Sequence, residues 1–430
     1  MVGVGSLAAG SIAAATLPFL PVDTVDVDFS TAMVLFGWAL GWALLAALST
    51  RFTDQPQRWA VVPATFMAVA GALVLVGPAT VTNTIGWVWP PALTALVVWS
   101  WIRARHDLHS PIRLWLLNPV LVIMMLLALG GTYEKIGQAT APAVSMHGRL
   151  VDVGPYRLHL ECQGSRGPTV VLEPGAGGSA ASMGLIAPAV ARDSRVCVYD
   201  RAGRGWSDPA ASTPDGAQIA TDLHTLLSRA HVPGPYVLAG HSFGGLYVRT
   251  YAAKYPDEVA GLVLVDSSAT SSNHPGPASK AGSYDALTHA SSLFATTSRL
   301  GLGRLLAEIN FAELPPRYRD DARATAVTGK EMAGVLAEYA VANRSAAAAA
   351  ALHGLGAKPL VVLTATHGTR PGWMGVQGTM ARLSTNSDHR LEPGADHSSF
   401  VADPTHAASV ARAIHDVVVS ARTGSPLPHP

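Results

Sequence analysis

The chain has 430 residues, which is enough for two domains, and its formal net charge is only +1. Its charges form no long run of one sign, so no basic face is available for nucleic acid, and a nucleic-acid partner is not expected. Charged residues are scarce before residue 134 and common after it. We therefore interpret the chain as a membrane block joined to a water-soluble block.

Four apolar stretches without a charged residue lie in the first block. Each approaches the roughly 20 residues with which a helix crosses a bilayer. They cover about residues 30–49, 59–80, 85–102 and 114–131. A further stretch, 2–20, is uncharged, is rich in Gly and Ala and lacks the basic leader of a signal peptide, so it is a candidate fifth span.

The short loops between these stretches predict their orientation. Loops 50–58 and 103–113 carry arginines, whereas 80–84 carries no charge. Positively charged loops stay in the cytoplasm, so the soluble block is predicted on the exterior face of the cell membrane. The absence of acids and bases within the four stretches favours anchoring or lipid contact over transport.

From Gly148 onward, short β-type runs separated by turns replace the long apolar stretches. The predicted strands are 150–153, 156–162, 169–173, 195–200, 236–239, 261–266, 359–364 and 388–391. Predicted helices between the later strands cover about 215–230, 245–255, 376–384 and 405–420. A hairpin followed by alternating strands and helices predicts an α/β fold with a mostly parallel sheet covered on both faces.

The segment 267–345 interrupts this alternation, and we interpret it as an inserted helical cap. The predicted domain plan is a membrane domain at 1–133 and a linker at 134–146. An α/β domain follows at 147–421. The Pro-rich tail, 422–430, is predicted to be disordered.

The fifth predicted strand ends in the sequence Gly-His-Ser-Phe-Gly at 240–244, and a helix follows. This is the G-x-S-x-G pattern in a strand–turn–helix setting. The turn is tight, and its strain points the hydroxyl of Ser242 out of the sheet. The start of the helix adds backbone N–H donors near a developing oxyanion. Ser242 is therefore predicted to be a nucleophile, against the alternative of a structural turn with an idle serine.

A serine nucleophile needs a base, and the loop after the last predicted strand supplies His397. His367 follows the wrong strand, and His389 lies within a strand. His241 adjoins Ser242, but its side chain is expected to point away from it. His397 is therefore the predicted base.

The acid is harder to locate. The segment 365–373, which follows the seventh predicted strand, contains no carboxylate. Asp266 ends the sixth strand beside the nucleophile strand, where it could hold Nδ1 of His397, although it could also cap the following loop. Asp396 is too close in sequence to His397 for a good hydrogen bond.

The oxyanion hole is expected to combine the N–H of Phe243 with one from the loop 173–178 after the third strand. Glycines in this loop allow the backbone to approach a substrate closely. Ala176 is the predicted donor, and Gly177 is the alternative.

Together with the turn Tyr-Asp-Arg-Ala-Gly-Arg-Gly-Trp-Ser-Asp at 199–208, these residues resemble the α/β-hydrolase superfamily over about 147–421. The resemblance implies an eight-stranded, mostly parallel sheet in the order 1-2-4-3-5-6-7-8. A serine at 242, where dehalogenases and epoxide hydrolases carry Asp, disfavours those two activities. Some family members take their acid from the sixth strand, where Asp266 lies. The resemblance does not extend to the membrane block.

The implied sheet order makes the second and fourth strands neighbours, and these strands carry the only two cysteines, Cys162 and Cys197. An exterior location allows oxidation, so a disulfide between them is expected. Two buried free thiols are the alternative.

These inferences together predict a multi-pass membrane protein that cleaves an ester or related acyl bond through an acyl-enzyme intermediate. The expected substrate is a small-molecule or lipid acyl compound. No cofactor and no metal are expected. An acyltransferase of the same mechanism and a non-catalytic receptor with a hydrolase-like pocket remain alternatives. The sequence leaves the oligomeric state open.

Overall fold

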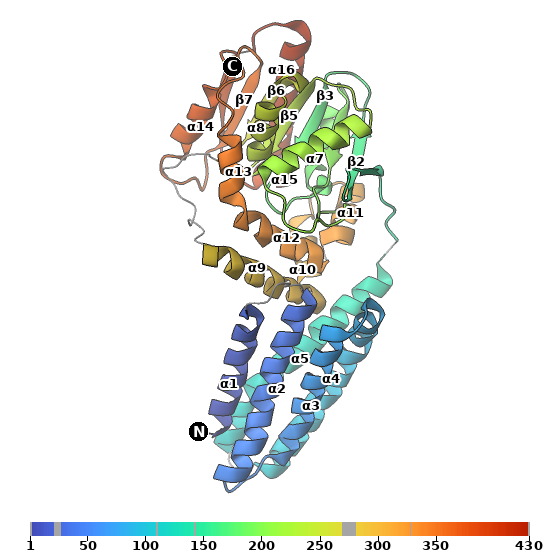
Figure 1. Ribbon diagram of the computed structural model, residues 1–430, viewed down its shortest axis with the longest axis vertical. Helices are drawn as coiled ribbons and strands as arrows, with labels where there is room; N and C mark the ends of the chain where they lie inside the picture. Colours follow the sequence, from blue (N-terminus) through green and yellow to red (C-terminus); the bar gives the residue numbers. More distant parts are fainter. Residues whose placement is uncertain are drawn as a thin grey trace. The chain divides into compact units, whose positions relative to one another are not determined.

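The computed structural model describes residues 2–20, 27–108, 111–141, 143–268, 281–326 and 328–428 (Figure 1). The chain divides into two compact units. The helical unit comprises Met1–Pro142, Asp285–Leu305 and Val327–Ala333. The α/β unit comprises Ala143–Tyr284, Leu306–Ala326 and Gly334–Pro430.

Five long helices build most of the helical unit. They are α1 (Val2–Thr16), α2 (Val27–Phe52), α3 (Val61–Val76), α4 (Ala79–Asp107) and α5 (Pro111–Thr140). Five segments, one at each of these helices, are long and apolar enough to cross a membrane, and the stretch near the N-terminus is one of them. Large side chains such as Trp42, Leu93 and Met124 are buried between the helices.

The helix α5 continues to Thr140, so the predicted linker 134–146 is helical over its first half. Polar side chains sustain the helix here, because Gln138 donates to Glu134 across one turn at 2.9 Å. The charge pattern that marks the end of the apolar run therefore does not mark the end of the helix.

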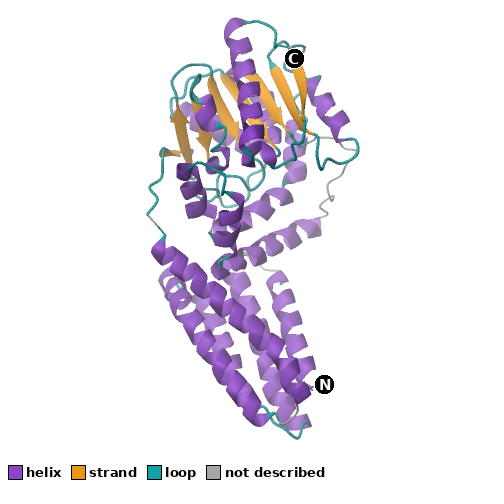
Figure 2. Ribbon diagram, turned by 180° about the vertical axis from the view of Figure 1, so that it is seen from behind, coloured by secondary structure: helices purple, strands orange, loops and turns teal. Residues whose placement is uncertain are grey.

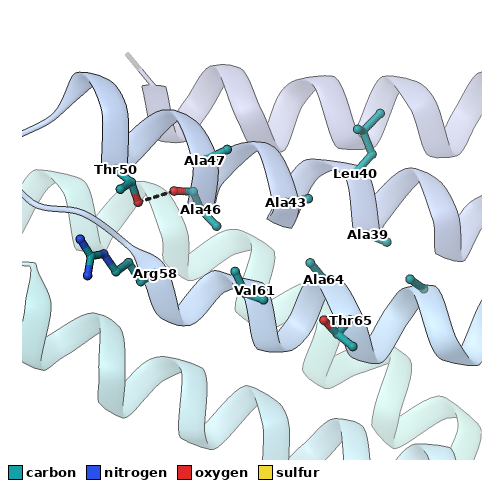
Figure 3. A pocket seen from close by; sticks show the side chains of 11 residues that line it. Ala39, Leu40, Ala43, Ala46, Ala47, Thr50, Arg58, Val61, Ala64 and Thr65 are labelled. Atoms are coloured by element: carbon teal, nitrogen blue, oxygen red, sulfur yellow. Dashed lines mark hydrogen bonds between the residues drawn. The ribbon is translucent and has the colours of Figure 1, made fainter.

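An open groove of about 770 Å³ runs between α2 and α3 within the helical unit (Figure 3). Small side chains, above all alanines, form most of its wall, and Arg58 also lines it. None of the predicted catalytic residues lines this groove.

The α/β unit contains the predicted eight-stranded sheet, in the order β1-β2-β4-β3-β5-β6-β7-β8. The strands are β1 (Arg149–Asp152), β2 (Arg157–Gln163), β3 (Thr169–Glu173), β4 (Val196–Tyr199), β5 (Tyr236–His241), β6 (Val259–Val265), β7 (Leu360–Ala365) and β8 (Ser387–Glu392). β2 runs antiparallel to β1 and β4, and the other pairs are parallel. The predicted fold class is therefore confirmed.

Helices cover both faces of this sheet (Figure 2). Residues of α6 (Ala187–Val190), α15 (Ser399–Ala402) and α16 (Pro404–Thr423) pack against one face. Residues of α7 (Gly216–Arg229), α8 (Gly244–Lys254) and α14 (Trp373–Ala381) pack against the other. The strands β3 to β7 are consequently buried on both sides, which explains why Val and Leu dominate them.

The cysteines face each other across the antiparallel pair β2–β4. Cys162 and Cys197 are register partners, and the structure joins them in a disulfide.

The predicted insertion is helical over most of its described part, whereas 269–280 lie outside the described residues. It contains α9 (Ala281–Thr296), a 3-10 turn (Thr297–Leu300), α10 (Leu302–Asn310), α11 (Pro316–Ala326), α12 (Gly329–Ala340) and α13 (Ala342–Ala349). It is not a cap belonging to the α/β domain alone, because 285–305 and 327–333 cluster with the helical unit, and divisions fall within α9, α10 and α12. Close packing accounts for this assignment. A Cβ at Gly130 of α5 would lie 2.7 Å from the carbonyl oxygen of Leu300.

The tail 422–430 was predicted to be disordered, but its described residues, 422–428, are ordered. Helix α16 ends at Thr423, and Leu427 beyond it is only 2% exposed. The N–H of Leu427 donates to the side-chain oxygen of Asn386 at 2.9 Å. Prolines prevent regular structure in this tail, but the buried side chain of Leu427 and the backbone hydrogen bonds of Ser425 and Leu427 dock its described part.

Candidate active site

The serine of the G-x-S-x-G sequence lies on a strained turn between β5 and α8. Ser242 has a φ of 55°, in the left-handed region that non-glycine residues rarely adopt. A Cβ at Gly240 would lie 2.5 Å from the carbonyl carbon of Gly244, and one at Gly244 would overlap the backbone of Glu173. Both glycines are therefore required by the close approach of neighbouring backbone.

Three side chains predicted from the sequence meet at the carboxyl end of the sheet. Nε2 of His397 lies 2.9 Å from Oγ of Ser242, and Nδ1 lies 2.6 Å from Oδ2 of Asp266. His397 belongs to the loop after β8, and Asp266 directly follows β6. The structure thus brings His397 together with two residues that lie 131 and 155 positions before it in the sequence.

The carboxylate of Asp266 has a second set of partners. Its Oδ1 accepts from the backbone N–H of Ala365 at 3.1 Å and from Nε1 of Trp373 at 2.7 Å. Burial by itself would raise the pKa of Asp266, but the hydrogen bonds from His397, Trp373 and Ala365 lower it below the usual value. Asp266 is therefore an ionised acceptor beside the imidazole, and it also anchors the start of the loop after β7.

His241, the neighbour of Ser242, supports the histidine loop. Its Nε2 donates to the backbone carbonyl of His397 at 2.8 Å, and the two rings lie 4.8 Å apart. Burial, reinforced by the nearby His397, lowers the pKa of His241 to about 4. The ring therefore stays neutral with its proton on Nε2. The sequence predicted only that the side chain of His241 points away from Ser242, and not that it contacts the backbone of His397.

Asp396 has a local role. Its Oδ1 accepts from the backbone N–H groups of Ser398 and Ser399 at 3.0 and 2.8 Å, at the start of α15. These hydrogen bonds lower its pKa. The carboxylate thus shapes the loop that carries His397.

The loop after β3 approaches the serine closely. A Cβ at Gly175 would lie 3.0 Å from Cβ of Ser242. The N–H of Gly177 donates to the carboxylate of Glu338 at 2.8 Å, so this alternative oxyanion donor is already occupied. Ala176 lies between them, and Phe243 stands at the start of α8.

A buried arginine holds this loop, and the sequence reasoning missed it. The guanidinium of Arg201, which is 2% exposed, donates to the carbonyl oxygens of Pro174 and Gly175 at 3.0 and 2.9 Å. It also pairs with the carboxylates of Glu173 and Glu338, at 2.8 and 2.9 Å. Arg201 belongs to the turn after β4, which entered the sequence analysis only as part of the family resemblance.

The two carboxylates around Arg201 differ in their proton affinity. Burial raises the pKa of Glu173 to about 7 despite the attraction of Arg201. Burial also acts on Glu338, but Arg201 and Arg204 together with the N–H of Gly177 lower its pKa below the usual value. Glu338 lies in α12 of the insertion, so its role could not be found without knowing how the insertion folds.

No metal centre is evident among the residues that the structure describes, since no three His, Cys, Asp or Glu side chains cluster in a suitable way. The chemical groups at the site are a hydroxyl, an imidazole, a carboxylate and the backbone N–H groups that surround them.

Comparison with known proteins agrees with this architecture. The model of the α/β-hydrolase fold family matches residues 168–404, which is more than half of the chain. The chain belongs to the α/β-hydrolase fold family, and the resemblance drawn from the sequence is confirmed. Family membership supports a hydrolase activity.

Individual relatives are similar over parts of the chain. An uncharacterized protein of Schizosaccharomyces pombe is 48% identical over 82 residues, covering 19% of this chain and 15% of that protein. An uncharacterized vacuolar membrane protein of Saccharomyces cerevisiae is 38% identical over 74 residues, covering 17% and 12%. The chain therefore spans only a small part of these relatives.

A thermophilic esterase from Thermogutta terrifontis has a similar solved structure, with a TM-score of 0.50 at 22% identity. The match covers 65% of this chain and 100% of the esterase. At this identity the likeness shows a shared fold.

Proposed function

We propose that the protein is a membrane-anchored serine hydrolase that cleaves an ester or related acyl bond. The observation that carries the proposal is the hydrogen-bonded series Ser242–His397–Asp266 on the scaffold of an α/β hydrolase. The strained backbone at Ser242 supports it further, because such strain typically persists at functional sites.

In the proposed reaction, Oγ of Ser242 attacks the substrate carbonyl while Nε2 of His397 accepts the hydroxyl proton. Asp266 holds the imidazole through Nδ1 and stabilises the imidazolium that forms. His397 then gives the proton to the leaving group, which leaves an acyl-enzyme. Water, activated by the same imidazole, releases the acid and restores the serine.

The developing oxyanion is assigned to the backbone N–H groups of Phe243 and Ala176. The engagement of Gly177 by Glu338 favours Ala176 over Gly177. Arg201 and Glu338 are positioning residues in this scheme, since they hold the loop that carries Ala176.

The membrane assignment rests on the five long apolar helices and fits the similarity to a vacuolar membrane protein of yeast. The finer proposal is a multi-pass protein of the cell membrane with its α/β unit outside. It is supported by the arginines of loops 50–58 and 103–113. The disulfide between Cys162 and Cys197 is typical of an oxidising compartment.

The test is labelling of the full-length protein with a fluorophosphonate probe, which reacts with activated serine hydroxyls. Wild type should be labelled, and Ser242→Ala should not. A panel of esters with increasing chain length then defines the substrate range. Wild type that stays unlabelled, or labelling that survives Ser242→Ala, would exclude the hydrolase and support the receptor alternative. Transfer of the acyl group to an added alcohol in preference to water would identify an acyltransferase.

A further inference from the structure

Helix α10 (Leu302–Asn310) of the insertion exposes apolar side chains on one face. Leu305 is 50% exposed and Ile309 is 65% exposed. Their spacing of four residues places them one turn apart on the same face. Elsewhere on the helix, the small residues Gly303 and Ala307 are buried. An apolar outer face opposite a closely packed inner face is typical of a helix that contacts lipid or another protein.

Arg304 ties the first turn of α10 to the end of α5. Its Nε and one terminal nitrogen lie 3.2 and 3.3 Å from the carboxylate oxygens of Glu134, and both side chains are largely buried. Glu134 is the first charged residue after the apolar run of α5. In a spanning helix this position marks the passage from hydrocarbon to headgroups. The beginning of α10 therefore lies at the level of the headgroups.

The start of helix α2 also contacts the residues just before α10. Arg299, just before α10, pairs with Asp28 in the first turn of α2. Gly301 packs on Tyr133 of α5, where a Cβ would lie 2.6 Å from Cδ1 of the tyrosine ring. Its φ of 75° also requires glycine. An exposed ion pair alone contributes only about 0–1 kcal/mol to stability. The contacts with α2 and α5 together, however, fix the depth of residues 299–304 relative to these two helices.

We propose that α10 lies in the lipid–water interface and that Leu305 and Ile309 contact bilayer lipid. The exposed apolar side of α5, which includes Leu126 and Leu129, continues to Tyr133, against which the turn before α10 packs. This continuity favours lipid over a second protein copy, because lipid surrounds the ends of the spans in any oligomeric state. The inference rests on the membrane anchoring of the proposed function.

The experiment uses the full-length protein in vesicles of phosphatidylcholine and phosphatidylglycerol. Leu305→Cys and Ile309→Cys each carry a small environment-sensitive fluorophore. The native cysteines form a disulfide and do not compete for the label. Ser212→Cys, in an exposed loop of the α/β unit, is the water-facing control. Leu126→Cys, which is 61% exposed on α5, is the control within the bilayer.

Labels at 305 and 309 should shift their emission to the blue and should be quenched by brominated lipid. Bromines near the headgroup end of the acyl chain should quench them most, because interfacial helices lie only about 5–10 Å deep. The label at 126 should instead be quenched most by bromines deep in the chain, and the label at 212 by neither.

Emission at 305 and 309 that matches the label at 212 would overturn the inference. If the label at 126 also escapes quenching, the anchoring itself is wrong. Emission at 309 that responds to protein density in the vesicle but not to bromine would assign the face to a second copy. Fluorophosphonate labelling of Ser242 is independent of all these readouts, so failure of the hydrolase chemistry is recognised separately.

Discussion

Replacing Asp266 with Asn tests the proposed mechanism most directly, because the structure defines how the new amide must orient. Oδ1 of Asp266 accepts two N–H groups, from Ala365 and Trp373, and Oδ2 faces Nδ1 of His397. In Asp266→Asn the amide oxygen must remain with the two donors. The NH2 group then faces Nδ1 of His397 and forces the imidazole into the tautomer with its proton on Nε2. That nitrogen can no longer accept the proton of Ser242.

The expected loss is large and confined to chemistry. A triad in the wrong tautomer loses about 10⁴-fold in kcat, which corresponds to about 5 kcal/mol of transition-state stabilisation. The fold should be retained, because the amide oxygen preserves both hydrogen bonds to Ala365 and Trp373. The assay is steady-state hydrolysis of a chromogenic ester by full-length protein, together with the rate of fluorophosphonate labelling.

Asp396→Asn is the matched control, because it changes the same chemical group one residue from His397. Its amide oxygen can still accept from the N–H groups of Ser398 and Ser399, so kcat should change little. A loss below about tenfold in Asp266→Asn would refute the assignment of Asp266. A loss in Asp396→Asn as large as in Asp266→Asn would show that loop geometry, and not the tautomer, had been perturbed.

Three further predictions concern the surroundings of the site. Glu338→Gln should lower kcat about tenfold with a smaller change in KM. The new amide oxygen can still accept from the N–H of Gly177, but the negative charge that holds Arg201 beneath the loop after β3 is lost. A change in KM alone would contradict this prediction. Burial lowers the pKa of His159, but the carboxylate of Asp200 at 2.8 Å, the backbone carbonyl of His147 and the charge of Asp321 together raise it above 6.5. The stability from this pair is therefore complete below about pH 6.5 and is lost as pH rises through the raised pKa. The thermal midpoint of wild type should fall over that interval relative to His159→Gln, and parallel curves would argue against a charged pair. Finally, alkylation in denaturant without reductant should add no mass, whereas two alkylated thiols would reject the disulfide, whose expected contribution to stability is about 2–4 kcal/mol.

Local sequence patterns were sufficient for most of the fold. The strands of the sheet were predicted within one or two residues at most ends, because their β-branched and aliphatic runs are bounded by Gly and Pro. The turn at Ser242 was recognisable because its glycines are required by backbone contacts within a few residues of the serine and with β3. The apolar stretches of the helical unit were visible because a bilayer demands length and an absence of charge, which are properties of composition.

The supporting residues of the site could not be predicted in the same way. Arg201 and Glu338 are 137 residues apart, and neither has a local pattern that indicates the other. Glu338 lies in a helix of the insertion, where many charged residues occur and nothing in the local sequence distinguishes it from them. The contact between His241 and the carbonyl of His397 also joins distant loops, so the sequence showed only a histidine next to a serine.

The sequence by itself determined the order of the elements, the apolar helices and the turn that carries the proposed nucleophile, since each depends on neighbouring residues or on hydrophobic periodicity. Tertiary structure alone decided that Arg201 and Glu338 hold the loop after β3, that Leu427 docks the tail, and that part of the insertion packs with the apolar helices. These features depend on contacts between distant segments, where burial turns an ordinary charge or an ordinary leucine into a specific partner.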